Sequence, residues 1–240
     1  MTWASQFSLF STLDYAALAV LTLGWLGIGW RIERPPAAQP SVSLLMDDFR
    51  RDWMRQMVTR QPRLFDSQLV GSLRQGATFF ASASMIAIGG GLALIGNTER
   101  LAGLAQDLTL GDTPTVVWEI KILVLLLFLS NAFLKFVWAH RLFGYCSVLM
   151  ASVPNEPEAD LAYPRAAQAA ELNITAARSF NRAMRATYFA LASVAWLLGP
   201  LPLMVATVLT AAVLYRREFA SQSRTVLLQI APETRQNTQS

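Results

Sequence analysis

Four long apolar runs constrain this 240-residue chain more than any other feature of its sequence. They cover residues 9–30, 76–96, 116–139 and 188–215. A bilayer core of about 30 Å is crossed by about 20 mostly apolar helical residues, and each run reaches that length. Only 15% of the residues are charged, whereas a soluble domain carries about 25%. We therefore predict an all-α integral membrane protein, a polytopic transmembrane helix bundle.

The basic residues orient these runs. The segment 31–74 contains eight Lys or Arg residues, the segment 135–185 contains six, and the segment 99–115 contains only Arg100. Because short loops rich in Lys and Arg stay on the cytoplasmic side, both basic segments are predicted to be cytoplasmic. Residues 1–13 contain no Lys or Arg. We therefore expect the first run to be an uncleaved span with its N-terminus outside.

The last apolar run contains helix breakers, because residues 198–202 read Leu-Gly-Pro-Leu-Pro. A turn there would return Arg216 and Arg217 to the cytoplasmic side. The preferred arrangement therefore has five spans and a cytoplasmic C-terminus, with the spans at about residues 9–30, 76–96, 116–139, 178–198 and 201–217. A single crossing kinked at proline, which gives four spans, is the alternative.

Residues 43–57 outside the spans predict an amphipathic helix, whose apolar residues recur at spacings of three and four: Met46, Phe49, Trp53 and Met57. Such a helix either lies in the cytoplasmic interface or packs against the ends of the spans. Residues 154–164, which contain prolines and acids, predict a flexible cytoplasmic loop. We predict one transmembrane domain over residues 1–225 and a disordered cytoplasmic tail over residues 226–240.

Small residues recur in the second run at Ala83, Ala87 and Gly91. Spacings of four place them on one helix face, where small side chains let another helix approach closely. The face serves either packing within the chain or a subunit interface in a homo-oligomer.

Polar residues in the third run form a first candidate for binding an anion or a lipid phosphate. Asn131 and Lys135 share one helix face, and Arg141 follows near it; Arg74 precedes the second run. Charged groups at membrane depth usually face a protein interior or an aqueous cavity. Lys135 lies near the cytoplasmic end of its span, so extension of its side chain to a lipid phosphate is the alternative explanation.

An arginine stripe is the second candidate. Arg178, Arg182 and Arg185 recur at i, i+4 and i+7, with Asn181 beside them. Three guanidinium groups on one stripe repel one another, so anions are expected nearby. Lipid phosphates, protein carboxylates such as Glu171, and a bound anionic substrate all remain open.

Enzyme signatures are absent from the sequence, which contains no GxSxG, HExxH, Walker A or CxxC pattern. One cysteine, Cys146, and one histidine, His140, cannot form a Cys/His metal cluster. We therefore expect no enzyme activity, cofactor or metal. The pI near 9.6 is assigned to contact with anionic lipid headgroups of the bilayer and not to nucleic acid. Glu119 and Lys121 are predicted to be interface residues near the outer end of the third span.

Several ordered segments resemble a known bacterial family. They read WMRQM at 53–57, GSLRQGATFFAS at 71–82, NAFLKFVW at 131–138, FNRAMRATYFAL at 180–191 and YRREF at 215–219. Together they resemble the membrane family named domain of unknown function 599. The resemblance implies a multi-pass protein of the bacterial cytoplasmic (inner) membrane, and it implies no activity.

Two functions follow from these residues. The first is an oligomeric channel or transporter for an anionic solute, with the candidate cations on its cytoplasmic side. No Asp or Glu lies near the middle of a predicted span, which disfavours proton coupling. The second is a non-catalytic scaffold or assembly subunit of a membrane complex, which would bind through the small-residue face and the helix over residues 43–57.

Overall fold

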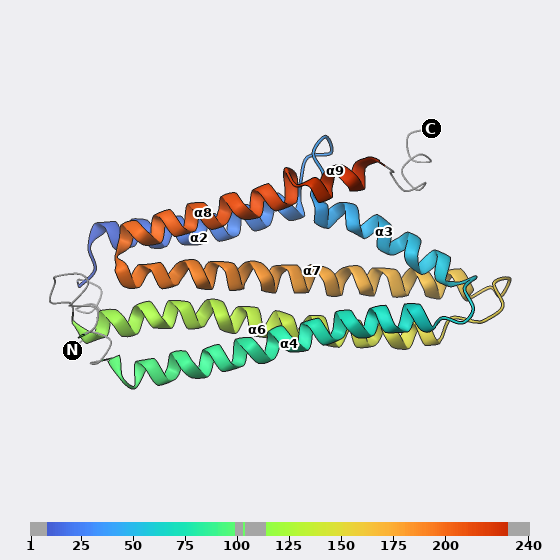
Figure 1. Cartoon of the computed structure of the whole chain (residues 1–240), viewed down its shortest axis with the longest axis horizontal. Coiled ribbons are helices and arrows are strands. Elements are labelled where there is room, and N and C mark those ends of the chain that lie inside the picture. Colours follow the sequence, from blue (N-terminus) through green and yellow to red (C-terminus); the bar gives the residue numbers. More distant parts are fainter. Residues whose placement is uncertain (1–8, 99–102, 104–113, 230–240) are drawn as a thin grey trace. The chain divides into compact units, whose positions relative to one another are not determined.

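The computed structural model describes residues 9–98, 103 and 114–229, and every regular element among them is a helix. The elements, drawn in Figure 1, follow in chain order: α2 (Thr12–Glu33), α3 (Val42–Met57), α4 (Leu64–Ile95), α6 (Thr115–Ala151), α7 (Ala162–Val194), the short 3-10 helix η1 (Ala195–Leu198), α8 (Pro200–Phe219) and α9 (Gln222–Gln229). The all-α prediction is confirmed for the described residues.

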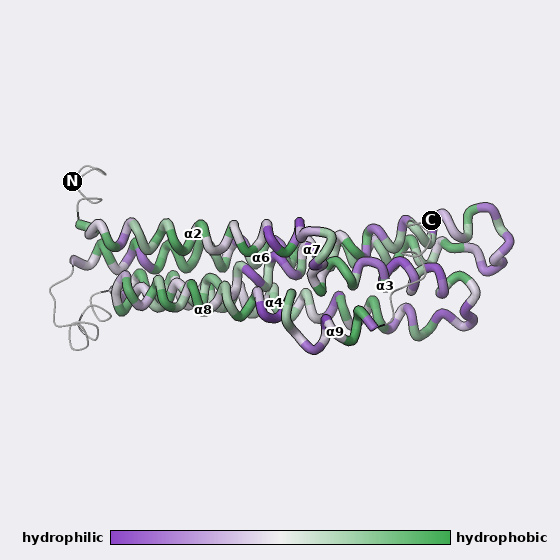
Figure 2. Tube along the Cα trace, turned by 90° about the horizontal axis from the view of Figure 1, so that it is seen from above, coloured by the Kyte–Doolittle hydropathy of each residue, from purple (hydrophilic) through white to green (hydrophobic). Residues whose placement is uncertain are grey.

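Among the described residues, three helices, α2, α4 and α6, are long and apolar enough to cross a membrane. Figure 2 shows α2 as mainly hydrophobic and α3 as mainly hydrophilic. The 32 residues of α4 and the 37 residues of α6 give lengths of about 48 and about 56 Å, which exceed a hydrocarbon core of about 30 Å. Both helices therefore carry residues outside a bilayer core.

The chain divides into two compact units. Unit 1 comprises residues 1–30, 82–133 and 183–214, and unit 2 comprises residues 31–81, 134–182 and 215–240. The division follows from the length of α4, α6 and α7, each of which contributes one part to each unit. The single transmembrane domain over residues 1–225 stays a prediction.

Unit 1 packs around apolar contacts between its helices. Ile122 and Leu126 of α6 form a buried cluster with Ala190 of α7. Gly24 of α2 allows a close approach, because a Cβ atom there would lie 3.1 Å from Thr207 of α8. Leu127 and other large apolar side chains of this unit are exposed. Exposed apolar faces of this extent are expected where lipid replaces water as the solvent.

The chain turns at Gly199, as the sequence predicts. Gly199 has a φ of 128°, a conformation that residues with a Cβ atom rarely adopt. Its N–H donates to the carbonyl of Trp196 at 3.0 Å, and α8 begins at the next residue. Phe189 of α7 and Thr207 of α8 both lie beside Gly24 of α2, and α7 and α8 run in opposite directions in Figure 1.

The core of unit 2 joins α3 to α4, α6 and α7. The predicted amphipathic helix is confirmed, but its buried face is shifted by about one residue from the predicted one. Leu45, Asp47, Met54 and Met57 are buried, whereas Trp53 is half-buried and packs at the edge of a core formed with α4, α6 and α7. Within unit 2, α3 is therefore packed against other helices, which was one of the two alternatives.

Side chains anchor both ends of α3. At its start, the Ser41 hydroxyl accepts from the N–H of Leu44 at 3.2 Å and donates to the carbonyl of Ile32 at 2.9 Å. Near its end, the Trp53 indole donates to the fully buried carboxylate of Asp66 at 2.7 Å. A buried carboxylate needs such donors, because its desolvation is otherwise costly.

Two predicted segments differ in part from the structure. Arg63 donates to the carbonyls of Val153 and Pro154 at the start of the α6–α7 connection, both at 2.7 Å, and the flexibility of residues 154–164 stays a prediction. The segment 154–164 also ends within α7, which starts at Ala162. Residues 226–229 of the predicted disordered tail are helical in α9, and residues 230–240 lie outside the described part of the chain.

Candidate functional site: a cleft between α3 and α7

Two arginines of the predicted stripe bind carboxylates within unit 2. Arg178 donates to Asp47 of α3 at 2.6 Å. Arg182 makes two bonds to Glu33 of α2, at 2.9 and 2.6 Å. Glu171, the carboxylate suggested from sequence, binds Arg51 of α3 at 2.8 Å instead. Of the three partners left open for the stripe, Arg178 and Arg182 have carboxylates.

Asp47 is only 3% exposed, although its partner Arg178 is half-exposed. Burial raises the pKa of the Asp47 carboxyl above its usual range, and the hydrogen bond from Arg178 offsets part of this effect. The pair is therefore a structural contact that holds α3 against α7. Asn181 adds a long hydrogen bond from its amide to the Ser43 hydroxyl, at 3.4 Å.

The candidate residues on α4 and α6 have separate partners. Arg74 donates to His140 Nε2 at 3.3 Å, and the Thr78 hydroxyl lies 2.8 Å from His140 Nδ1. Thr78 itself donates to the carbonyl of Arg74, so the contacts fit the tautomer with a proton on Nδ1. Arg141 donates to the hydroxyl of Tyr145 at 2.6 Å.

These contacts separate the predicted residues into groups. Within unit 2, Arg178, Asn181 and Arg182 contact α2 and α3, whereas Arg74 and Arg141 contact α6. The main-chain carbonyl of Lys135 accepts from Ser179 at 2.9 Å. The remaining two candidates, Asn131 and Arg185, belong to unit 1, where Arg185 is only 7% exposed. The structure does not gather the eight predicted residues into one described site.

The three small residues of α4 have different surroundings. A Cβ atom at Gly91 would lie 2.5 Å from the Leu126 side chain, so Gly91 serves packing within unit 1. Ala83 and Ala87 are exposed. Gly89 and Gly90 face open space, because no atom lies within 4 Å of a Cβ built on either residue.

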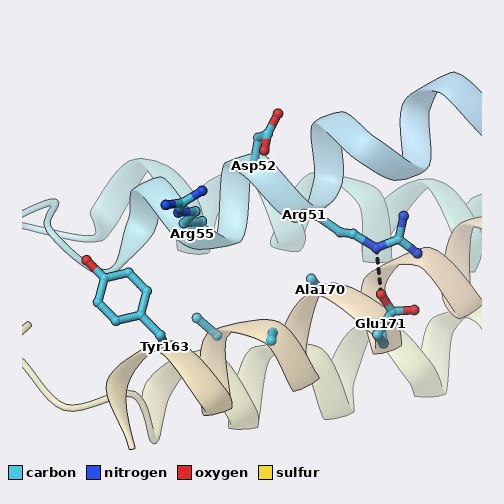
Figure 3. A pocket seen from close by; sticks show the side chains of 8 residues that line it. Arg51, Asp52, Arg55, Tyr163, Ala170 and Glu171 are labelled. Atoms are coloured by element: carbon cyan, nitrogen blue, oxygen red, sulfur yellow. Dashed lines mark hydrogen bonds and ion pairs between the residues drawn. The ribbon is translucent and has the colours of Figure 1, made fainter. Parts of the chain in front are cut away.

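A cleft of about 520 Å³ lies between α3 and α7 in unit 2 (Figure 3). Its volume falls in the range of about 300–1,000 Å³ that is typical of small-molecule sites. The α3 side contributes Arg51, Asp52 and Arg55. The α7 side contributes Tyr163, three alanines and Glu171, the alanines being Ala166, Ala167 and Ala170.

The two arginines of the cleft differ in their partners. Arg51 is bound by Glu171 at 2.8 Å and by Asp48 at 3.1 Å. The hydrogen bond that Arg51 donates to Glu171 raises the pKa of Arg51 above its usual value. The Arg55 guanidinium, in contrast, is exposed and has no hydrogen-bond or ion-pair partner among the described residues. Arg55 is therefore the cation of this cleft that is available to a ligand.

Sequence reasoning missed this cleft. Neither Arg51 nor Arg55 is among the residues that the sequence singles out as site candidates, and the alanines of α7 carry no chemical signal. The spacing of Tyr163, Ala166, Ala167 and Ala170 does place them along one helix side. Only the packing of α3 on α7 shows that this side faces a cluster of guanidinium groups.

Lys121 is more buried than the sequence predicts. It was predicted to be an interface residue, but it is only 7% exposed in unit 1. Its ammonium lies 5.1 Å from the ring centre of Trp118 and 5.7 Å from that of Trp196. Trp196 in turn donates to Asp14 at 2.8 Å. The two indole faces stabilise the buried cation through cation–π attraction.

A metal site does not emerge from the part of the chain that the structure describes, where no three His, Cys, Asp or Glu side chains gather. The polar lining of the cleft consists of two guanidinium groups, a phenol and the carboxylates of Asp52 and Glu171; the guanidinium groups and the phenol are the groups that bind an anion. The cleft therefore offers polar groups that can bind an anion next to an apolar surface.

Comparison with known proteins decides the family. The model of the family described as "Protein of unknown function, DUF599" matches residues 16–223. The chain belongs to this family. The match covers the cleft, the arginine stripe and the turn at Gly199, and it agrees with the resemblance carried by the sequence segments. No curated protein and no solved structure matches the chain.

Proposed function

We propose that this DUF599 protein is a five-span protein of the bacterial cytoplasmic membrane that handles an anionic solute, as a transporter or channel, and binds it in the cleft between α3 and α7. The observation that carries the proposal is Arg55, a guanidinium without a carboxylate partner among the described residues, at a cleft of ligand size. Arg55 replaces the arginine stripe as the proposed anion-binding residue, because Arg178 and Arg182 are already neutralised by Asp47 and Glu33.

The turn at Gly199 supports five spans. Residues 183–198 of unit 1 precede it, and α8 follows it with 20 residues, about 30 Å of helix. Both stretches expose large apolar side chains, among them Leu191 before the turn and Val208 after it. Exposed apolar faces on either side of a tight turn fit two crossings of a bilayer.

The distribution of basic residues supports the orientation. Of the 20 Lys and Arg residues, unit 1 contains three, Arg100, Lys121 and Arg185, and unit 2 contains the other 17. The positive-inside rule then favours a membrane position for unit 1 and a cytoplasmic position for unit 2. In this topology the N-terminus is outside and the C-terminus is cytoplasmic.

Anion flux tests the proposal. The purified protein in liposomes is expected to release a trapped anion from a panel of chloride, phosphate, sulfate and carboxylates of several lengths. Arg55→Gln should lower the flux by about tenfold, because a hydrogen bond to a charged group contributes about 1.5–3 kcal/mol. Arg34→Gln is the matched control, because Arg34 is exposed and distant in sequence from the cleft. A protein that neither moves nor binds any member of the panel would refute the proposal.

A second candidate function, a scaffold of a membrane complex, is favoured by the open glycines of α4. A glycine within a helix costs about 1 kcal/mol relative to alanine, and neither Gly89 nor Gly90 is required by contacts in the described chain. Close approach of a helix from another subunit would explain both. Gly90→Leu should then reduce the co-purification of a membrane partner or of a tagged second copy. Unchanged co-purification would count against the scaffold.

A further inference from the structure

The charges along the cleft between α3 and α7 indicate which polar group of a ligand could bind there. Figure 3 shows Arg51 and Glu171 at one end of the cleft and Arg55 near Tyr163 at the other. The first end is neutralised by the Arg51–Glu171 contact at 2.8 Å. At the second end, neither the Arg55 guanidinium nor the Tyr163 hydroxyl has a hydrogen-bond partner among the described residues. One cation and one donor suit a ligand with one anionic group, whereas a polyphosphate would need further cations.

The surface between the two ends, the floor of the cleft formed by Ala166, Ala167 and Ala170, indicates what the rest of the ligand is like. Ala166 and Ala170 are almost fully buried, so the part of this alanine floor that a ligand can cover is mainly the exposed Ala167. Their methyl groups form no hydrogen bonds, so a small hydrophilic anion would gain nothing from this surface. An apolar chain that covers it would be stabilised in proportion to the apolar area that it removes from water. The Asp52 carboxylate, which also lines the cleft, points away from α7 in Figure 3 and leaves the floor apolar.

We infer that the cleft binds a single-headed anionic amphiphile, in which an apolar chain lies on Ala166, Ala167 and Ala170 and one carboxylate or phosphate group meets Arg55 and Tyr163. This inference rests on the proposed function and deepens it by naming the class of anion. The same chemistry has two sources, a fatty acid that enters from solution and a phosphate-headed lipid that enters from the bilayer.

Photo-crosslinking of the full-length protein tests the inference. The protein is placed in nanodiscs of phosphatidylcholine and labelled with dodecanoate that carries a diazirine on its chain. Labelled peptides, identified by mass spectrometry, should contain residues 51–55 and 163–171. Unlabelled dodecanoate should displace the probe at a concentration at least about tenfold lower than butanoate does, because each buried CH₂ contributes about 0.8 kcal/mol. Dodecanol, which has the same chain without a charge, should compete at least about tenfold less well than dodecanoate.

Two variants locate the ligand without disturbing the core. Arg55→Gln removes the charge, and Ala167→Trp fills the floor from an exposed position. Each should weaken labelling of these peptides about tenfold, and Arg34→Gln should leave it unchanged. Thermal unfolding of each variant confirms that the fold is retained. In a parallel arm, phosphatidate replaces a tenth of the bilayer lipid; protection by phosphatidate identifies the bilayer as a source, and protection by dodecanoate alone identifies the solution.

The outcomes separate this inference from the proposed function. If butanoate or inorganic phosphate competes as well as dodecanoate, the cleft binds anions without an apolar body, and only the inference is overturned. Labelling that is unaffected by Ala167→Trp, or that falls outside both peptides, also overturns it. If no member of the anion panel binds or moves, the proposed function itself fails.

Discussion

At the scale of single residues, the charges of unit 2 are mostly used for holding helices together. Arg178 and Arg182 meet carboxylates on α3 and α2, and Arg63 holds the α6–α7 connection through main-chain carbonyls. Arginine suits such roles because its planar group makes several hydrogen bonds at once. A high content of arginine is therefore poor evidence for an anion site unless a guanidinium such as Arg55 remains unused.

The Arg182–Glu33 pair is predicted to be structural. Both side chains are partly exposed, so Arg182→Gln should lower the free energy of unfolding by only about 0.5–1 kcal/mol. It should leave anion binding unchanged, because the Arg182 guanidinium is already paired with the Glu33 carboxylate. Thermal unfolding and binding to the purified variant provide the two readouts, with Arg34→Gln as the control. A loss of anion binding without a loss of stability would show instead that Arg182 contributes to the anion site.

Asp47 is predicted to give an unusual dependence of stability on pH. Its pKa is raised in the folded protein above its usual value of 3.8, chiefly by burial. The folded state therefore binds this proton more tightly than the unfolded state does, and protonation stabilises the fold. The wild type should gain stability relative to Asp47→Asn as the pH falls from the raised pKa toward 3.8.

Thermal unfolding of both proteins between pH 7 and the acid limit of solubility measures this difference. Because the two proteins share all other titrating groups, the difference curve isolates Asp47. Every tenfold change in proton affinity corresponds to about 1.4 kcal/mol. A difference that favours Asp47→Asn increasingly at low pH would show that Arg178 dominates over burial and lowers the pKa.

At the scale of helices, glycine positions distinguish packing from open surface. Gly91→Ala should destabilise the protein by about 1–3 kcal/mol, because its Cβ atom would lie 2.5 Å from Leu126. Gly90→Ala should be neutral or stabilising by up to about 1 kcal/mol, because its Cβ atom meets open space. Unfolding in denaturant compares the two neighbours directly. Equal effects would contradict the packing of α4 on α6.

The sequence predicts which segments are helices better than it predicts what they face. Apolar runs and the breakers at residues 198–202 suffice for α2, α4, α6 and the turn at Gly199, because length and backbone chemistry are local properties. The buried face of α3 shifts because its partners come from distant parts of the chain. Lys121 is buried for the same reason, since Trp196 is 75 positions away in the sequence.

The candidate site was less accessible to sequence reasoning than the fold. The arginine stripe is conspicuous in the sequence because its spacing is regular. Asp47 and Glu33, which neutralise Arg178 and Arg182, lie about 130 and 150 positions earlier in the chain and carry no such pattern. The cleft depends on three alanines and one unused guanidinium, and neither type of residue stands out in a helix. Partner choice across α3 and α7 is thus a property of the tertiary structure: α3 contributes Asp47 to the pair with Arg178 and one wall of the cleft, whereas Arg182 pairs with Glu33 of α2.

At the scale of the whole molecule, the two units divide the chemistry of the chain. Unit 1 contains three of the 20 basic residues and most of the length of α2 and α8, whereas unit 2 contains α3, the ion pairs and the cleft. In the proposed topology this division matches two environments, lipid for unit 1 and water for unit 2. The same division makes the number of spans testable, because each crossing changes the side on which the next basic segment lies.

Reporter fusions test the resulting topology. An alkaline phosphatase joined after Gly199 should be active, because that turn is expected outside, and a fusion after Arg217 should be inactive, because Arg216 and Arg217 are expected in the cytoplasm. A fluorescent protein that folds only in the cytoplasm should give the opposite pattern at the same two sites. Gly199→Ala, which forces a side chain into a φ of 128°, should lower stability by about 1–3 kcal/mol without changing the side of Arg217. Phosphatase activity after Arg217 in the unaltered chain would mean that α7 and α8 cross only once, and the basic end of α8 would then lie outside against the positive-inside rule.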